Sequence, residues 1–115
     1  MNGVNTNGDF LKKLQEIIRN NLKDPEFGVS SLAREMGMSR SNLHKKVNAL
    51  AKISVSKLIR QERLNAGLKL LKNTSSTVSE IAYEVGFNNV SYFIKCFHET
   101  LPASIQWISS RFENE

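Results

Sequence analysis

Residues 29–38, VSSLAREMGM, return later in the chain as VSEIAYEVGF at residues 78–87. A short polar turn and a second helical pattern follow each copy, SRSNLHKKV at 39–47 and NNVSYFIKCF at 88–97, and the second turn is one residue longer. The glycine of each copy can take a sharp bend that other residues avoid, so that the following helix is presented outward. The repeat therefore predicts two helix-turn-helix units in one chain.

The length of 115 residues fits one compact domain, or two small lobes that share an element. No apolar run approaches the ~20 residues of a membrane span, and the N-terminus lacks the pattern of a secretory signal. We therefore expect a cytoplasmic domain without membrane contact, and the single Cys96 fits a reducing compartment. Residues 1–8 are polar and rich in Gly and Asn, so we expect a disordered leader or linker before a domain at residues 9–112.

The apolar spacing predicts an all-α fold of about seven helices and no strand. Asp9 is expected to cap the first helix, and Pro25 to close it. The first helix-turn-helix unit is expected at about 28–51, opened by Gly28, with Ser39 as the cap of its second helix. The apolar residues that should face inward in this part are Phe10, Leu11, Leu14, Ile17, Ile18, Leu22, Leu43, Val47 and Leu50.

A long linking helix is expected at about 55–72, capped by Ser54, between the two units. The second helix-turn-helix unit is expected at about 77–99, where Thr77 and Glu80 form the pattern of a capping box. The last helix should follow Pro102 and carry Ile105, Ile108 and Phe112.

Basic residues are concentrated between Ser39 and Lys72, where Glu62 is the only acid. They are Arg40, Lys45, Lys46, Lys52, Lys57, Arg60, Arg63, Lys69 and Lys72. A clustered basic surface is expected for a polyanion partner, although a solvated lysine-rich helix face gives the same pattern. Together with the repeat, it favours double-stranded DNA. A linking helix of about 25 Å could hold two recognition helices roughly one duplex turn, ~34 Å, apart, in consecutive major grooves.

Several stretches resemble the DNA-binding domain of AraC/XylS-type bacterial transcription regulators, over roughly residues 10–112. They are IAYEVGF at 81–87, SYF at 91–93, KCF at 95–97, the stretch 32–47, and Ile59-Arg60-x-x-Arg63-Leu64. The resemblance implies sequence-specific double-stranded DNA binding for transcription regulation. MSRSNLHKK at 38–46 further resembles the output domain of two-component regulators, including hybrid sensor–regulators. That resemblance implies a sensor or receiver domain upstream in the full protein.

The chain departs from this family at the turn after each recognition helix, where the usual pattern is Gly-x-Ser-Pro. The copies here read KISV at residues 52–55 and PASI at residues 102–105. Lys52 and Pro102 thus stand where a left-handed residue would be easiest, and Pro cannot take positive φ. We therefore expect a locally different second turn, which leaves the pose of the last helix open.

Candidate base contacts lie on the two expected recognition helices. They are Ser41, His44 and Lys45, onto which the family's base-reading positions map, and Ser91, Tyr92, Ile94 and Lys95. Ile94 could meet a thymine methyl or pack inside its own domain, and Tyr92 could bond a phosphate or cover the core with its ring. The candidate phosphate contacts, which fix register without reading sequence, are Arg40, Asn42, Lys46, Lys52, Lys57, Arg60 and Asn89. Arg63 is expected to be structural instead, as an ion-pair partner of Glu35 or Glu84.

Other chemistry has little support in the sequence. His44, His98 and Cys96 lack metal-ligand spacing, and Cys96 is most simply a small packing residue. No catalytic Ser/His/Asp or Cys/His set and no Gly-rich phosphate loop can be recognised, so we expect no enzyme, metal or cofactor. The rival function is a helical protein-interaction module that contacts RNA polymerase or another regulator. Steep salt dependence would distinguish DNA binding from that module.

Overall fold

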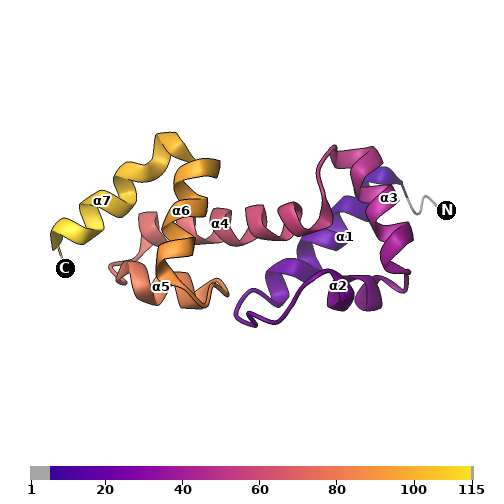
Figure 1. The fold of residues 1–115 in the computed structure, drawn as a ribbon, viewed down its shortest axis with the longest axis horizontal. Helices are drawn as coiled ribbons and strands as arrows, with labels where there is room; N and C mark the ends of the chain where they lie inside the picture. Colours follow the sequence, from indigo (N-terminus) through magenta and orange to yellow (C-terminus); the bar gives the residue numbers. More distant parts are fainter. Residues whose placement is uncertain (1–5, 115) are drawn as a thin grey trace. The chain divides into compact units, whose positions relative to one another are not determined.

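The computed structural model describes residues 6–114 as helices joined by short turns, with no strand among them (Figure 1). The elements are α1 (Asn7–Asn20), α2 (Val29–Met36), α3 (Arg40–Ala51), α4 (Val55–Asn73), α5 (Val78–Glu84), α6 (Val90–Thr100), the 3-10 turn η1 (Pro102–Ser104) and α7 (Ile105–Asn114). The predicted all-α class is therefore confirmed. None of the helices in this described part is long and apolar enough to cross a membrane.

The chain forms two compact units, and the boundary between them falls inside α4, between Glu62 and Arg63. Unit 1 comprises residues 1–21 and 27–62, which include α1, α2, α3 and the first part of α4. Unit 2 comprises residues 22–26 and 63–115, and thus the rest of α4 with α5, α6, η1 and α7. Each unit contains one helix-turn-helix pair, α2–α3 or α5–α6, as the repeat predicted.

Side-chain caps set where several of the helices begin, α3, α4 and α5 among them. The hydroxyls of Ser39 and Ser54 each accept a main-chain N–H three residues ahead at 3.1 Å, and so begin α3 and α4 as predicted. Thr77 and Glu80 form the predicted capping box at the start of α5. Thr77 Oγ1 accepts the Glu80 N–H at 3.1 Å, and Glu80 Oε1 accepts the Thr77 N–H at 2.8 Å. These caps satisfy N–H groups that the first helical turn leaves unpaired.

The first helix begins earlier than predicted. It begins at Asn7 because Thr6, not Asp9, is its cap, and Thr6 Oγ1 accepts the Asp9 N–H at 3.1 Å. The leader that was predicted at residues 1–8 therefore loses its last two residues to α1. Of the other six residues, Thr6 is the cap of α1 and residues 1–5 lie outside the described part of the chain.

The same helix also ends earlier than predicted. It ends at Asn20, so that Pro25 does not close it. The Asn21 N–H bonds the carbonyl of Ile18 at 3.0 Å, and Asn21 Nδ2 bonds the carbonyl of Ile17 at 2.8 Å. The side chain and main chain of Asn21 thus pair two of the carbonyls that the last turn leaves open.

The core of unit 1 is apolar and draws on all of its helices. Helix α1 packs on α2, and α2 packs on α3. Leu43 and Val47 face inward as predicted, whereas Leu50 is only half-buried. The buried apolar side chains are Leu14, Ile18, Phe27, Leu32, Ala33, Leu43, Val47, Val55, Leu58 and Ile59. Since α3 buries one face, its opposite face is left to solvent.

The core of unit 2 is built around aromatic rings. Phe93 of α6 contacts Phe87 edge to face at 5.1 Å between centroids, and Phe97 at 5.8 Å. Cys96 is buried beside them, in agreement with the packing role that was predicted. Ile108 of α7 is buried as well, whereas Phe112 of the same helix is 50% exposed. The other core residues are Leu64, Leu71, Val78, Ile81, Ala82 and Val85.

Candidate nucleic-acid interface

Polar and basic side chains cover the outward face of α3, the second helix of its helix-turn-helix pair. The turn before it contains Gly37 in the left-handed conformation, with φ 68° and ψ 30°. Leu43 and Val47 are fully buried, so the residues around them on the helix surface point to solvent. The exposed residues are Arg40, Ser41, Asn42, His44, Lys45 and Lys46. The structure thus places every candidate contact of this helix at the surface.

Lys46 differs from its exposed neighbours because it has an aromatic partner. Its Nζ lies 4.3 Å from the ring centroid of Phe10 in α1, within the range of a cation–π interaction. No sequence pattern indicates this contact, since the two residues lie on different helices. The pair belongs to a hollow of about 290 Å³ that is also lined by Asp9, Lys13, Met36 and Met38. A phosphate contact by Lys46 would therefore have to compete with the ring of Phe10.

Lys52 ends α3 in the left-handed conformation, with φ 62° and ψ 23°. It is the one non-glycine residue with positive φ among those described, and its N–H bonds the carbonyl of Asn48 at 3.0 Å. The predicted left-handed turn is thus present without the glycine that makes it easy. Lys52 and Lys57 are exposed and Arg60 is half-buried, so all three remain available near the C-terminal end of α3 and the start of α4.

The second turn of this kind is built differently, as Pro102 required. The chain passes from α6 through Leu101, at φ −129°, into the 3-10 turn η1 with Pro102 at its first position. Pro fits the first position of a helical turn because its missing N–H has no partner there. The predicted local difference between the two turns is therefore confirmed.

Helix α6 begins with Asn89 as its cap. Asn89 Oδ1 accepts the Tyr92 N–H at 2.9 Å, which leaves the amide nitrogen of Asn89 as the donor that a phosphate contact would use. Ser91 and Lys95 are exposed on the first turns of α6. Polar groups and a helix N-terminus therefore share one end of α6, the arrangement that binds anions.

Tyr92 and Ile94 both have packing roles in unit 2. The ring of Tyr92 lies 6.1 Å from that of Phe87 and is 48% exposed, so it covers part of the core while its outer part meets solvent. Ile94 is half-buried and packs against the core. Of the two roles that the sequence left open for each residue, the intramolecular one is present in both.

Arg63 lies in α4 and is one of two buried charged residues in the described chain. Its Nη1 donates to the carbonyl oxygens of Leu22 at 2.5 Å and Val85 at 2.8 Å, and its Nη2 donates to that of Asp24 at 3.1 Å. Burial lowers the pKa of Arg63 below its ordinary value, and the charge of Asp24 offsets only part of this shift. The structural role predicted for Arg63 fits this arrangement, with main-chain carbonyls as acceptors. Glu84, one of the carboxylates that we expected beside it, lies 3.0 Å from Lys23 Nζ.

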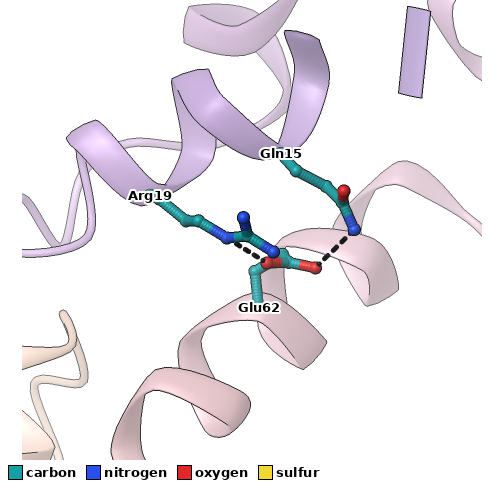
Figure 2. Close-up of polar contacts among 3 residues, drawn as sticks. All are labelled: Gln15, Arg19 and Glu62. Carbon is teal, nitrogen blue, oxygen red and sulfur yellow. Dashed lines mark hydrogen bonds and ion pairs between the residues drawn. The ribbon is translucent and has the colours of Figure 1, made fainter. Parts of the chain in front are cut away.

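Glu62, the residue before Arg63, anchors α1 in unit 1. Figure 2 shows its carboxylate between two side chains of α1, with Gln15 Nε2 at 3.2 Å and Arg19 Nε at 3.1 Å. In the sequence, Glu62 was notable only as the single acidic residue of the basic segment 39–72. No local pattern marks its donors, because Gln15 and Arg19 lie 47 and 43 residues away in sequence.

A model of the helix-turn-helix domain family matches residues 32–106 of the chain. The chain belongs to the AraC-type helix-turn-helix family. The matched residues include α3, α4, α5 and α6, and therefore both outward helices. The AraC-type resemblance that the sequence predicted is thus confirmed.

Two curated relatives of this AraC-type domain come from bacteria. The transcriptional activator NphR of Rhodococcus sp. is 33% identical over 94 residues, which cover 82% of this chain and 28% of that protein. Histidine kinase P4 of Formosa agariphila is 30% identical over 106 residues, which cover 92% of this chain and 8% of that protein. The chain therefore spans less than a third of either relative.

A solved structure has the same AraC-type fold. It is the C-terminal domain of the two-component response regulator yesN from Fusobacterium nucleatum, which is 28% identical with a TM-score of 0.71. The match covers 81% of this chain and 96% of that one. Family membership and these relatives make the chain a DNA-binding domain for transcription regulation.

Charge is unevenly divided between the two units of this AraC-type domain. Unit 1 has ten basic residues and four acidic ones, whereas unit 2 has six and seven. In unit 2 the acidic Glu80 and Glu84 are occupied by the capping box and by Lys23. Because phosphate neutralisation dominates DNA affinity, we expect unit 1 to supply the stronger electrostatic attraction to DNA.

Proposed function

We propose that this domain binds a specific double-stranded DNA site as a monomer, with α3 and α6 in two consecutive major grooves. The observation that carries the proposal is the presence of two helix-turn-helix pairs in one chain, each with a side-chain cap and exposed polar residues on its second helix. In this class of motif the N-terminal residues of the second helix contact base edges.

Base reading is assigned to the exposed residues of the two helices. Lys45 and Lys95 can donate to guanine, and His44 and the serines can bond several base edges. Ile94 could offer only the exposed part of its side chain to a thymine methyl, because the rest packs on the core. The proposed base contacts are Ser41, His44, Lys45, Ser91, Tyr92, Ile94 and Lys95.

Phosphate anchoring is assigned to donors beside the two helices. Lys57 and the Asn89 amide lie at helix starts, where main-chain N–H groups also favour anions. Lys46 would exchange the ring of Phe10 for a phosphate. The proposed phosphate contacts are Arg40, Asn42, Lys46, Lys52, Lys57, Arg60 and Asn89.

We further propose that the domain is the cytoplasmic output part of a longer sensor or response regulator. Support comes from the length of the relatives and from their names, a histidine kinase and a two-component response regulator. In this proposal any enzymatic catalysis belongs to other domains of the full protein, and this domain has no enzymatic activity.

Selection of bound duplexes from random sequence tests the DNA proposal directly. We expect one asymmetric site of two adjacent segments, with one protein per duplex in sedimentation of the complex. Affinity should fall steeply with salt, because several Lys and Arg residues displace counterions. A palindrome that binds two proteins, each with one unit idle, would contradict the monomer proposal.

A second candidate function, contact with RNA polymerase or another regulator, is favoured by one surface of unit 2. Tyr83 of α5 is 54% exposed beside a hollow of about 680 Å³. The other lining residues are Lys23, Leu70, Ser76, Glu80, Ile81 and Glu84. Exposed tyrosines beside hollows are typical of protein contacts. Tyr83→Ala should then reduce transcription from a target promoter without a change in DNA affinity, and normal transcription would remove this candidate.

A further inference from the structure

Arg63 has the contacts of a clamp on the turn that precedes α6. One guanidinium nitrogen bonds the carbonyls of both Leu22 and Val85, and the other bonds that of Asp24. Val85 is the first residue after α5, so the clamped carbonyl belongs to the helix-turn-helix turn itself. The other two carbonyls belong to residues 22–26, the loop segment that forms part of unit 2.

Gly86 makes room for this clamp. It has φ 90°, a conformation that favours glycine, and a Cβ built there would collide with the Arg63 guanidinium and with the carbonyl oxygen of Leu22. The equivalent residue of unit 1, Gly37, has φ 68° but nothing within 4 Å of a Cβ. The turn of unit 1 thus needs a glycine only for its backbone, whereas the turn of unit 2 also needs one for the close approach of Arg63.

We propose that Arg63 is a positioning residue for the second recognition helix: it holds the turn from which α6 starts without touching DNA. This inference rests on the DNA binding that was proposed for α6. The candidate contacts Ser91, Tyr92 and Lys95 lie within two turns of the start of α6, so a shift of the turn moves all of them. Recognition groups must be held within about 0.5 Å of their working geometry.

The planar fork of an arginine is what the clamp requires. Its nitrogens bond three carbonyls that lie in different directions, and the guanidinium stays charged despite its burial. A lysine at this position would keep the charge, but its single ammonium on a flexible stem would not reproduce the fork. Arg63→Lys should therefore remove the positioning without a change in the net charge of the domain.

Arg111 of α7 offers a matched control in the same unit. Its guanidinium also bonds three carbonyls, those of Leu71 at 2.5 Å, Thr74 at 2.9 Å and Ser76. These carbonyls belong to the end of α4 and the loop before α5, not to the turn before α6. Arg111→Lys thus removes a clamp of the same chemistry that does not bond the turn before α6.

Footprinting on a duplex selected by the wild-type chain tests the proposal. The segment contacted by α6 is first identified as the one that the double variant Ser91→Ala/Lys95→Ala leaves unprotected. We expect Arg63→Lys to raise the protein concentration that half-protects that segment about tenfold, which is the effect of one lost base contact. Protection of the other segment should remain, and Arg111→Lys should leave both segments protected.

Amide hydrogen exchange in α6 separates positioning from folding. We expect the amides of Phe93 and Phe97, in the core of unit 2, to stay protected in Arg63→Lys. Loss of this amide protection would show a merely structural role and overturn the proposal. Two footprinting results would also overturn it: full protection of both DNA segments by Arg63→Lys, or loss of the α6 segment in Arg111→Lys. A wild-type chain without any footprint would instead overturn the proposed function, and this inference with it.

Discussion

Nε of Arg19 lies 3.1 Å from Oε1 of Glu62, and Nε2 of Gln15 lies 3.2 Å from the other oxygen of the same carboxylate. The carboxylate is buried, with 8% of the Glu62 side chain exposed, whereas the Arg19 side chain is 57% exposed. Two neighbouring turns of α1 therefore bond one buried group of α4 within unit 1. The contact is an anchor for α1 and not an ordinary surface ion pair.

Glu62→Ala should lower the free energy of unfolding by about 1–3 kcal/mol, because it removes two bonds to a charged acceptor. Glu62→Gln should cost less, since an amide oxygen can still accept from Arg19. Urea unfolding of both variants measures the difference. Glu16→Ala, on the exposed side of α1, is the control. If Glu62→Ala cost no more than Glu16→Ala, the anchor assignment would be wrong.

Lys52→Gly should make the domain more stable and its DNA binding weaker. Left-handed backbone costs a non-glycine residue about 1–2 kcal/mol, from which the greater freedom of glycine in the unfolded chain removes roughly half. Loss of the proposed phosphate contact of Lys52 should reduce the salt slope by about one unit. Thermal unfolding and salt titration check the two effects, with Lys57→Ala as the control that loses charge without relief of strain. A lower free energy of unfolding for Lys52→Gly would show that the backbone of Lys52 is not strained.

Gly37→Ala and Gly86→Ala should differ in cost although the two glycines occupy equivalent places in the repeat. Gly37→Ala should cost about 1–2 kcal/mol, because only its positive φ opposes a side chain. Gly86→Ala should lower the free energy of unfolding by about 1–3 kcal/mol more than that, because its Cβ also collides with Arg63 and Leu22. Denaturant unfolding of the two variants decides the matter, and equal losses would show that the space at Gly86 is not limiting.

His44→Ala and Lys45→Ala should change sequence preference, each by about 1–3 kcal/mol of discrimination. Lys57→Ala and Arg60→Ala should weaken binding to all duplexes alike, because phosphates carry no sequence information. Titration of each variant with a selected duplex and with random duplex separates the two behaviours. Matching losses on both duplexes for His44→Ala and Lys45→Ala would contradict the assignment of α3 to the groove.

Unit 1 should supply most of the affinity, because it has ten basic residues against four acids while unit 2 has six against seven. Lys45→Ala with Lys46→Ala should therefore weaken binding clearly more than Lys95→Ala with Ser91→Ala. Footprinting of both double variants at matched salt measures the difference. Loss of all protection in the second double variant alone would reverse the assignment.

The helices, the repeat and most of the caps could be predicted from the order of the amino acids, since these features depend on residues within one or two turns. Apolar spacing exposes a helical period, and Ser39, Ser54 and the Thr77–Glu80 pair cap main-chain groups three residues away. The left-handed residue at Lys52 was expected from the family's Gly-x-Ser-Pro pattern, and it is present. The predicted cap of α1, Asp9, was wrong by three residues, because Thr6 caps this helix.

The partners of the charged and aromatic side chains depend on how separate helices pack, and could not be predicted. The acceptors of Arg63 lie 22 to 41 residues away in sequence, and the donors to Glu62 lie 43 and 47 residues away. No local spacing marks such partners, because a guanidinium or a carboxylate bonds whichever groups the folded chain brings near it. The same holds for Lys46 over Phe10 and for the exposed Phe112, whose surroundings exist only once separate helices have packed.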